Sequence, residues 1–292
     1  MCGTVAVSAA NDQHRFDRLS LIISTMTVYR SQIYCGVVAT GFANGVSDRV
    51  AESLARDGPI VALMEMFGVS LIAWLAMGTT IWLVLQAGAE RARRSDFGVA
   101  CAAACAFLIP LPQLSWLALA GVAVFLASTS SQGTLRRAAV LLGAVTVPMF
   151  WARIAFAVFG GPILAVDAKM VGWIVGTGGV GNTVPFADGS GVVFLLPACS
   201  SLTNISLAFL CGVMIVKLYD LRWSRTVIRA LVAACLTTVA INLARISLIG
   251  VMPAYYDIIH GTVGVTLAEL ATNLTVMAIY AGALRSDEPI HA

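Results

Sequence analysis

Long apolar segments, separated by short polar or basic connections, recur along almost the whole chain. A run of about 20 apolar residues has the length of a helix that crosses a membrane. The pattern therefore predicts an all-α polytopic membrane protein with about eight transmembrane helices. The expected spans are residues 21–43, 60–85, 97–109, 114–127, 138–159, 200–215, 227–251 and 262–284.

The first apolar segment is interrupted by Arg30 and Gln32, so an interfacial helix is the alternative to a span there. Residues 47–58 are charged and polar, which predicts a loop or a short surface helix. Two short spans are expected to form a hairpin around Pro110 and Pro112. The longest region outside the predicted spans is 160–198, and it contains a glycine-rich stretch.

The composition supports a membrane protein and excludes an ordinary soluble domain. Of the 292 residues, 59% are hydrophobic and 11% are charged, whereas soluble domains carry about 25% charged residues. Nothing in the chain suggests nucleic-acid binding, a cofactor or a metal site. The glycines of Gly176-x-Gly178-x-x-Gly181 match a dinucleotide fingerprint, but no strand–helix unit with an acidic partner surrounds them. We interpret that stretch as a flexible substrate-entry loop.

Basic residues orient the predicted helices, because cytoplasmic loops carry an excess of Lys and Arg. When the spans are counted, the clusters all fall on one side; they are Arg91/Arg93/Arg94, Arg136/Arg137, Lys217/Arg222/Arg225/Arg229 and Arg285. We therefore expect a cytoplasmic tail at 1–20, N-terminal transmembrane helices at 21–137, a second transmembrane half at 138–285 with an outer loop at 160–198, and a cytoplasmic tail at 286–292.

This orientation gathers three reactive side chains at the non-cytoplasmic interface. Cys199 begins its span there, and His260 directly precedes the last span. Arg245 lies about 18 residues beyond Val227, or roughly 27 Å along a helix. A structural cysteine, a snorkelling arginine and a solvated histidine are the common alternatives for each residue alone. Together they form the parts of a cysteine acyl-transfer site.

The chain has seven cysteines and no CxxC pair. The odd count leaves at least one cysteine unpaired, and Cys199 is the candidate.

The order of these residues resembles the exosortase/archaeosortase family. The matching motifs are Ala198-Cys199-Ser200, Asn242-x-x-Arg245-Ile246 and His260-x-x-x-Gly264, each at the outer end of successive spans. The resemblance covers roughly residues 138–284. The chain departs from the family at Ser201, where a glycine usually follows Cys-Ser.

The resemblance implies a membrane-embedded cysteine peptidase or transpeptidase of the bacterial inner membrane, with its active site facing the periplasm. Its expected partners, besides membrane lipid, are exported proteins that end in a PEP-CTERM-like sorting signal: a short motif such as Pro-Glu-Pro, a transmembrane helix and a basic tail. Cys199 is expected to form a thioacyl-enzyme, His260 to transfer protons, and Arg245 to stabilise the oxyanion or orient the substrate.

Three further residues are expected to support this site. Asn242 lies one helical turn before Arg245 and is placed to hold its guanidinium group. Ser200 follows the cysteine, and Asp188 in the outer loop is a candidate partner for His260. The alternative function is a transporter or scaffold in which Arg245 and Glu269 form an intramembrane pair that binds a small anion. Transporters often contain internal repeats, and none is evident here.

Overall fold

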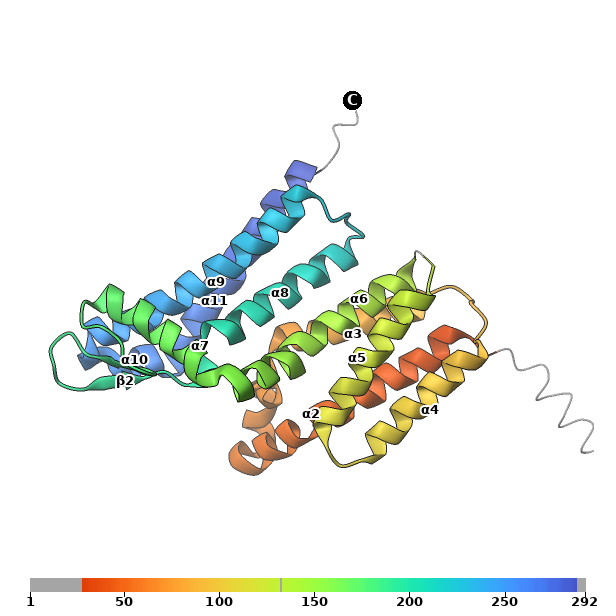
Figure 1. The fold of residues 1–292 in the computed structure, drawn as a ribbon, viewed down its shortest axis with the longest axis horizontal. Helices are drawn as coiled ribbons and strands as arrows, with labels where there is room; N and C mark the ends of the chain where they lie inside the picture. The colour runs from red at the N-terminus through yellow and green to blue at the C-terminus, as the bar shows by residue number, and fades with distance from the viewer. Residues whose placement is uncertain (1–27, 132, 288–292) are drawn as a thin grey trace, which may run out of the picture.

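The protein is described from a computed structural model, which places residues 28–131 and 133–287. These residues form a bundle of helices that run roughly alongside one another, with one small hairpin of strands (Figure 1). The main helices are α2 (Arg30–Met64), α3 (Leu71–Gln86), α4 (Arg94–Leu108), α5 (Pro112–Thr129), α6 (Thr134–Thr146), α7 (Ala152–Val175), α8 (Ser201–Leu218), α9 (Arg225–Val251) and α11 (Thr262–Asp287).

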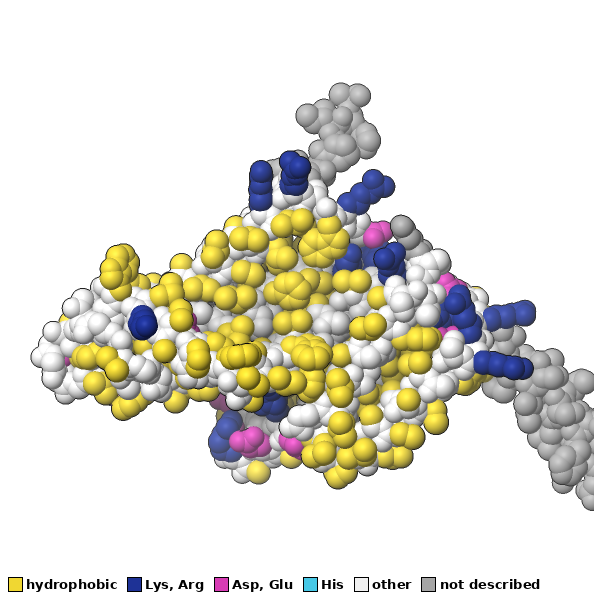
Figure 2. Space-filling view, in the orientation of Figure 1, with side chains coloured by type: hydrophobic (Ala, Val, Ile, Leu, Met, Phe, Trp, Pro, Cys, Tyr) yellow, Lys and Arg dark blue, Asp and Glu magenta, His cyan; other side chains and the backbone are white. Residues whose placement is uncertain are grey.

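Five helical segments in the described part of the chain are long and apolar enough to cross a membrane. Their outward surfaces carry many exposed apolar side chains, and Figure 2 shows this apolar cover across the middle of the molecule. The finding confirms the prediction of an all-α membrane protein. The segments are Pro112–Thr129, Thr134–Val175, Ser201–Leu218, Arg225–Val251 and Val263–Ala283.

The boundaries of the first helices differ from those predicted. Residues 47–58, expected to be a loop or a short surface helix, continue α2, and their charged side chains lie on a helix instead of in a connection. The predicted span 60–85 is divided, because α2 ends at Met64 and α3 begins only at Leu71. Positive φ angles at Met66, Phe67 and Gly68 turn the chain there, and a positive φ at Gly58 kinks α2 itself. Residues 21–27 of the first predicted span lie outside the described residues.

A bend separates α6 from α7. The five residues Val147–Trp151 form a π-helical turn that contains Pro148, and the chain then turns away from the line of α6 (Figure 1). A proline removes one helical hydrogen bond, and π turns are common at such bends. After the bend, α7 continues to Val175, so residues 160–175 of the predicted outer loop 160–198 are helical.

The rest of that outer region is an antiparallel hairpin of β1 (Thr183–Pro185) and β2 (Val192–Phe194). Its glycine-rich part packs against α7. A Cβ atom at Gly172 or Gly179 would collide with backbone atoms of the facing segment. The amide of Ala187 also donates to the carbonyl of Gly250 on α9, at 2.9 Å. The glycines thus serve close backbone packing, and the region is a tethered structural layer over α7 and α9.

Three apolar clusters form the interior of the described bundle. The largest joins α2 to α6 with part of α8. A second lies between α7, the hairpin and the C-terminal part of α9. The third joins α8, α9 and α11 around Tyr280. Cys199 packs against the second cluster and is therefore surrounded by residues of α7 and α9.

Arg30, predicted only as an interruption of an apolar segment, is the centre of a buried polar network. Its Nε donates to Oδ1 of Asp96 at 3.0 Å, and neither side chain is more than 1% exposed. Further bonds go to Thr129 Oγ1 at 2.8 Å and Glu90 Oε2 at 3.2 Å. The Tyr34 hydroxyl also donates to Asp96 at 2.8 Å. The network joins α2, α4 and α5 at one end of the bundle.

Replacing Arg30 by methionine should strongly destabilise the protein, because it leaves the Asp96 carboxylate buried without a cation. Breaking such a pair costs about 3–5 kcal/mol. The measurement is the midpoint of thermal unfolding in detergent. Arg56→Met is the matched control, since the Arg56 side chain that pairs with Asp57 is 59% exposed and such pairs contribute at most about 1 kcal/mol. Equal losses in both variants would contradict a structural role for the buried network.

Candidate functional site

Cys199 is the last residue of a single 3₁₀ turn, Pro197–Cys199, immediately before α8. The turn arises locally, because Pro197 occupies its first position and the Cys199 amide donates to the Leu196 carbonyl at 2.9 Å. Ser200 then acts as the N-cap of α8, its hydroxyl accepting from the Thr203 amide at 3.4 Å. The half-buried thiol therefore belongs to a rigid turn at a helix start, where partial positive charge favours negative charge nearby.

Asn242 on α9 contacts this turn directly. Its side-chain Nδ2 donates to the backbone carbonyl of Cys199 at 2.7 Å, and the Asn242 side chain is buried. We expected Asn242 to hold the guanidinium of Arg245, but its amide instead binds the backbone of the cysteine. The two sequence motifs that contain these residues are thus joined by a hydrogen bond, although 43 positions separate them.

Asp167 on α7 is a site residue that the sequence analysis missed. Its Oδ2 accepts the backbone amide of Ser201 at 3.0 Å, and only 4% of Asp167 is exposed. A carboxylate at the first turn of a helix satisfies one of the free amides and complements the helix dipole. The signal in the sequence was a lone acidic residue within an apolar run, in a region we predicted to be a loop.

The opposite end of α8 is held by a basic side chain. Arg137 on α6 donates through Nε to the carbonyl of Lys217 at 2.8 Å and through Nη2 to the carbonyl of Leu218, also at 2.8 Å. A cation at a helix C-terminus satisfies carbonyls that have no partner within the helix. Charged residues of opposite sign therefore fix both ends of the helix that follows Cys199.

The other predicted residues lie around this turn without bonding to it. Arg245 is half-buried on α9, one helical turn beyond Asn242. His260 is exposed at the end of α10 (Tyr256–His260), where its imidazole stacks on Tyr256 with ring centroids 5.0 Å apart. Its neighbour Ile259 packs against the same apolar cluster as Cys199. Within residues 28–131 and 133–287, no hydrogen bond joins the Cys199 thiol to the side chain of Arg245 or His260.

Asp188 has a different partner from the one we expected. The amide and hydroxyl of Ser190 both donate to its Oδ1, at 2.9 and 2.7 Å. These bonds lower the pKa of the exposed Asp188 carboxyl below its ordinary value. The carboxylate thus stabilises the turn between β1 and β2, and in the described residues it makes no bond to His260.

The alternative pairing of Arg245 with Glu269 is also not formed: Glu269 is exposed on α11, and the ion pairs of the described chain do not include these two residues. No group of three or more His, Cys, Asp or Glu side chains in the described part is arranged to hold a metal ion.

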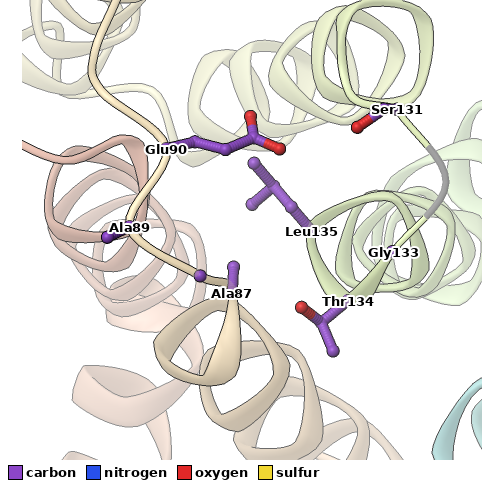
Figure 3. Close-up of a pocket in the computed structure, with 8 residues that line it drawn as sticks. Ala87, Ala89, Glu90, Ser131, Gly133, Thr134 and Leu135 are labelled. Carbon is purple, nitrogen blue, oxygen red and sulfur yellow. The ribbon is translucent and has the colours of Figure 1, made fainter.

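A pocket of about 360 Å³ lies away from Cys199, where the α3–α4 connection faces the α5–α6 connection. Figure 3 shows Glu90, Thr134 and Leu135 around it. Glu90 is its single charged lining residue among those described, and that carboxylate already accepts from Arg30. The described residues that line this pocket include no cysteine and no histidine.

Comparisons of the chain with protein families, with curated proteins and with solved structures find no match. The resemblance of the three motifs therefore remains a hypothesis, which rests on the residues and on their arrangement.

We predict that Asp167→Leu destabilises the protein by about 1–3 kcal/mol, because the Ser201 amide loses its acceptor inside the structure. Asp167→Asn retains an acceptor oxygen and should lose less. The measurement is again the midpoint of thermal unfolding, with the exposed Asp188→Asn as the control, expected to change by less than about 0.5 kcal/mol. If Asp167→Leu unfolds at the wild-type temperature, the bond to Ser201 does not contribute to stability.

Proposed function

We propose that the chain is a membrane-embedded cysteine peptidase or transpeptidase that cleaves a C-terminal sorting signal of exported proteins. The observation that carries the proposal is the hydrogen bond between Asn242 and the carbonyl of Cys199. It joins the Cys-Ser turn to the helix that carries Asn-x-x-Arg, so the nucleophile candidate and the arginine candidate belong to one rigid unit. Asp167 reinforces this unit from α7.

The chemistry follows from the three side chains. His260 first accepts the proton of the Cys199 thiol, and the resulting thiolate attacks the scissile carbonyl carbon. A C–S bond forms, and Arg245 stabilises the negative charge that develops on the carbonyl oxygen. The C–N bond then breaks, and the amine leaves with a proton supplied by His260. An amine, hydroxyl or water next attacks the thioacyl carbon and transfers its proton to His260. The C–S bond then breaks and releases the Cys199 thiolate, which takes the proton back from His260.

This mechanism requires a movement of α10. His260 is exposed and stacked on Tyr256, so the imidazole must approach the thiol when substrate binds. The short helix is suited to such a shift, since Pro253 begins the 3₁₀ turn before it and Gly261 follows it. Catalytic hydrogen bonds are often long in enzymes without substrate and form in the complex.

We further propose eight membrane spans, formed by α2, α3, α4, α5, α6, α8, α9 and α11, in a bacterial inner membrane. Lys and Arg side chains gather along the edge of the molecule where α8 ends and α6 and α9 begin (Figures 1 and 2). Under the positive-inside rule this edge is cytoplasmic. Cys199 lies at the other end of α8, which corresponds to the periplasmic face.

Cys199→Ala should lower processing to below about one thousandth of the wild-type rate, because no covalent intermediate can form. The assay follows cleavage of a co-expressed exported protein that carries a Pro-Glu-Pro motif, a transmembrane helix and a basic tail, normalised to enzyme level in the membrane. Cys235→Ala is the matched control: this half-buried thiol on α9 lies 3.9 Å from the Ile205 carbonyl and should be dispensable. Normal processing by Cys199→Ala would exclude covalent catalysis by this thiol.

The proposed orientation predicts the labelling of two introduced cysteines in a chain whose own cysteines are replaced. Asp257→Cys, on exposed α10, should react with an impermeant maleimide in cells with a permeabilised outer membrane. Tyr219→Cys, at a residue that is 62% exposed between α8 and α9, should react only after the inner membrane is opened. The reverse pattern would contradict a periplasmic site.

A further inference from the structure

A cavity of about 630 Å³ lies between the N-terminal helices and the start of α8. Its walls come from the outer half of α2, the bend between α6 and α7, and the first turns of α8. Pro197, which begins the Cys199 turn, borders it. The cavity therefore lies at the same end of the bundle as Cys199, although Cys199 itself does not line it.

Basic side chains dominate the polar part of the lining. Arg49 and Arg56 reach it from α2, and Arg153 from α7. Arg56 pairs with Asp57, but Arg49 and Arg153 have no ion-pair partner in the described chain. Both of these guanidinium groups belong to residues that line the same cavity. Glu52 is the one acidic residue among the described residues of the lining. Two arginines without an ion-pair partner in one cavity favour an anionic ligand, because guanidinium groups form strong charge-assisted hydrogen bonds to carboxylate and phosphate.

Ser53 provides a second, independent indication. The residue lines the cavity one helical turn from Arg49, only 2% of it is exposed, and its Oγ has no hydrogen-bond partner in the described structure. Buried hydroxyl groups are normally paired, and leaving one unpaired costs free energy. A ligand oxygen in the cavity would supply the missing partner.

Several apolar side chains also line the cavity, among them Phe67, Met149, Phe156 and Leu207. A lining that combines cationic and apolar side chains suits an amphiphile with an anionic head. Basic pockets between transmembrane helices bind the phosphate head groups of lipids in this way. Arginine is also suited to phosphate, because its planar guanidinium donates two parallel hydrogen bonds.

We propose that this cavity is a binding site for a phosphate-bearing ligand, whose phosphate is held by Arg49, Arg153 and the hydroxyl of Ser53. The same chemistry is offered by the phosphate of an anionic phospholipid and by free phosphate. The site is independent of the proposed peptidase activity, since it involves neither Cys199 nor substrate cleavage.

The test is an equilibrium titration of the purified full chain in neutral detergent with dihexanoyl phosphatidic acid. Arg49→Gln combined with Arg153→Gln should weaken binding by at least about tenfold, the factor expected when charge-assisted hydrogen bonds are lost. Arg222→Gln combined with Arg225→Gln is the matched control, because these exposed arginines lie at the other end of α8 and its connection to α9. Its affinity should equal that of the wild type.

Two further titrations identify the source of the phosphate. If inorganic phosphate displaces phosphatidic acid at comparable concentration, the ligand is a free phosphate; if it does not, and zwitterionic dihexanoyl phosphatidylcholine binds weakly, the ligand is an anionic lipid. Absence of binding by both anions, or equal affinity in the Arg49/Arg153 variant, overturns the site. If the Arg49/Arg153 variant does not fold, Ser53→Ala provides the test. Its affinity for phosphatidic acid should fall by about threefold or more, and an unchanged affinity overturns the proposal.

Discussion

The backbone amide of Ser201, bonded to the buried carboxylate of Asp167, is the interaction on which the arrangement around Cys199 depends. The start of α8 is inside the protein, where a free amide is costly. Asp167 satisfies that amide from α7, and Asn242 binds the preceding turn from α9. Three helices therefore meet at one short turn, and the position of the thiol follows from polar groups that the interior cannot leave unpaired.

The same constraint organises the other end of the bundle. Arg30 is buried with Asp96, and the surrounding hydroxyls complete its hydrogen bonds. Inside lipid, helices attract one another only weakly through apolar contacts, so polar contacts between helices contribute to their specific pairing. The protein thus has two polar anchors, one at each end, with apolar packing between them.

The sequence was sufficient to predict the class of fold, because a helix that crosses a membrane needs a long apolar segment and such segments are visible in the sequence. It also singled out Asn242 and Cys199 as candidates, and a hydrogen bond joins these two residues in the structure. It was less informative where polar residues sit on helices: residues 47–58 resemble a loop in composition but continue α2. Asp167 was missed because its role depends on α8, a partner that lies 34 positions further along the chain. Local pattern cannot identify such a pairing.

The backbone bond at position 201 also has an evolutionary consequence. Asp167 recognises the amide of this residue and makes no use of its side chain, and the Ser201 hydroxyl has no partner in the described structure. This position therefore requires a small residue, since it is buried, and an N–H group, which excludes proline. Glycine, alanine and serine all meet both conditions. Serine at position 201 is thus compatible with the hydrogen bond that holds the turn, because the bond uses only the backbone N–H group.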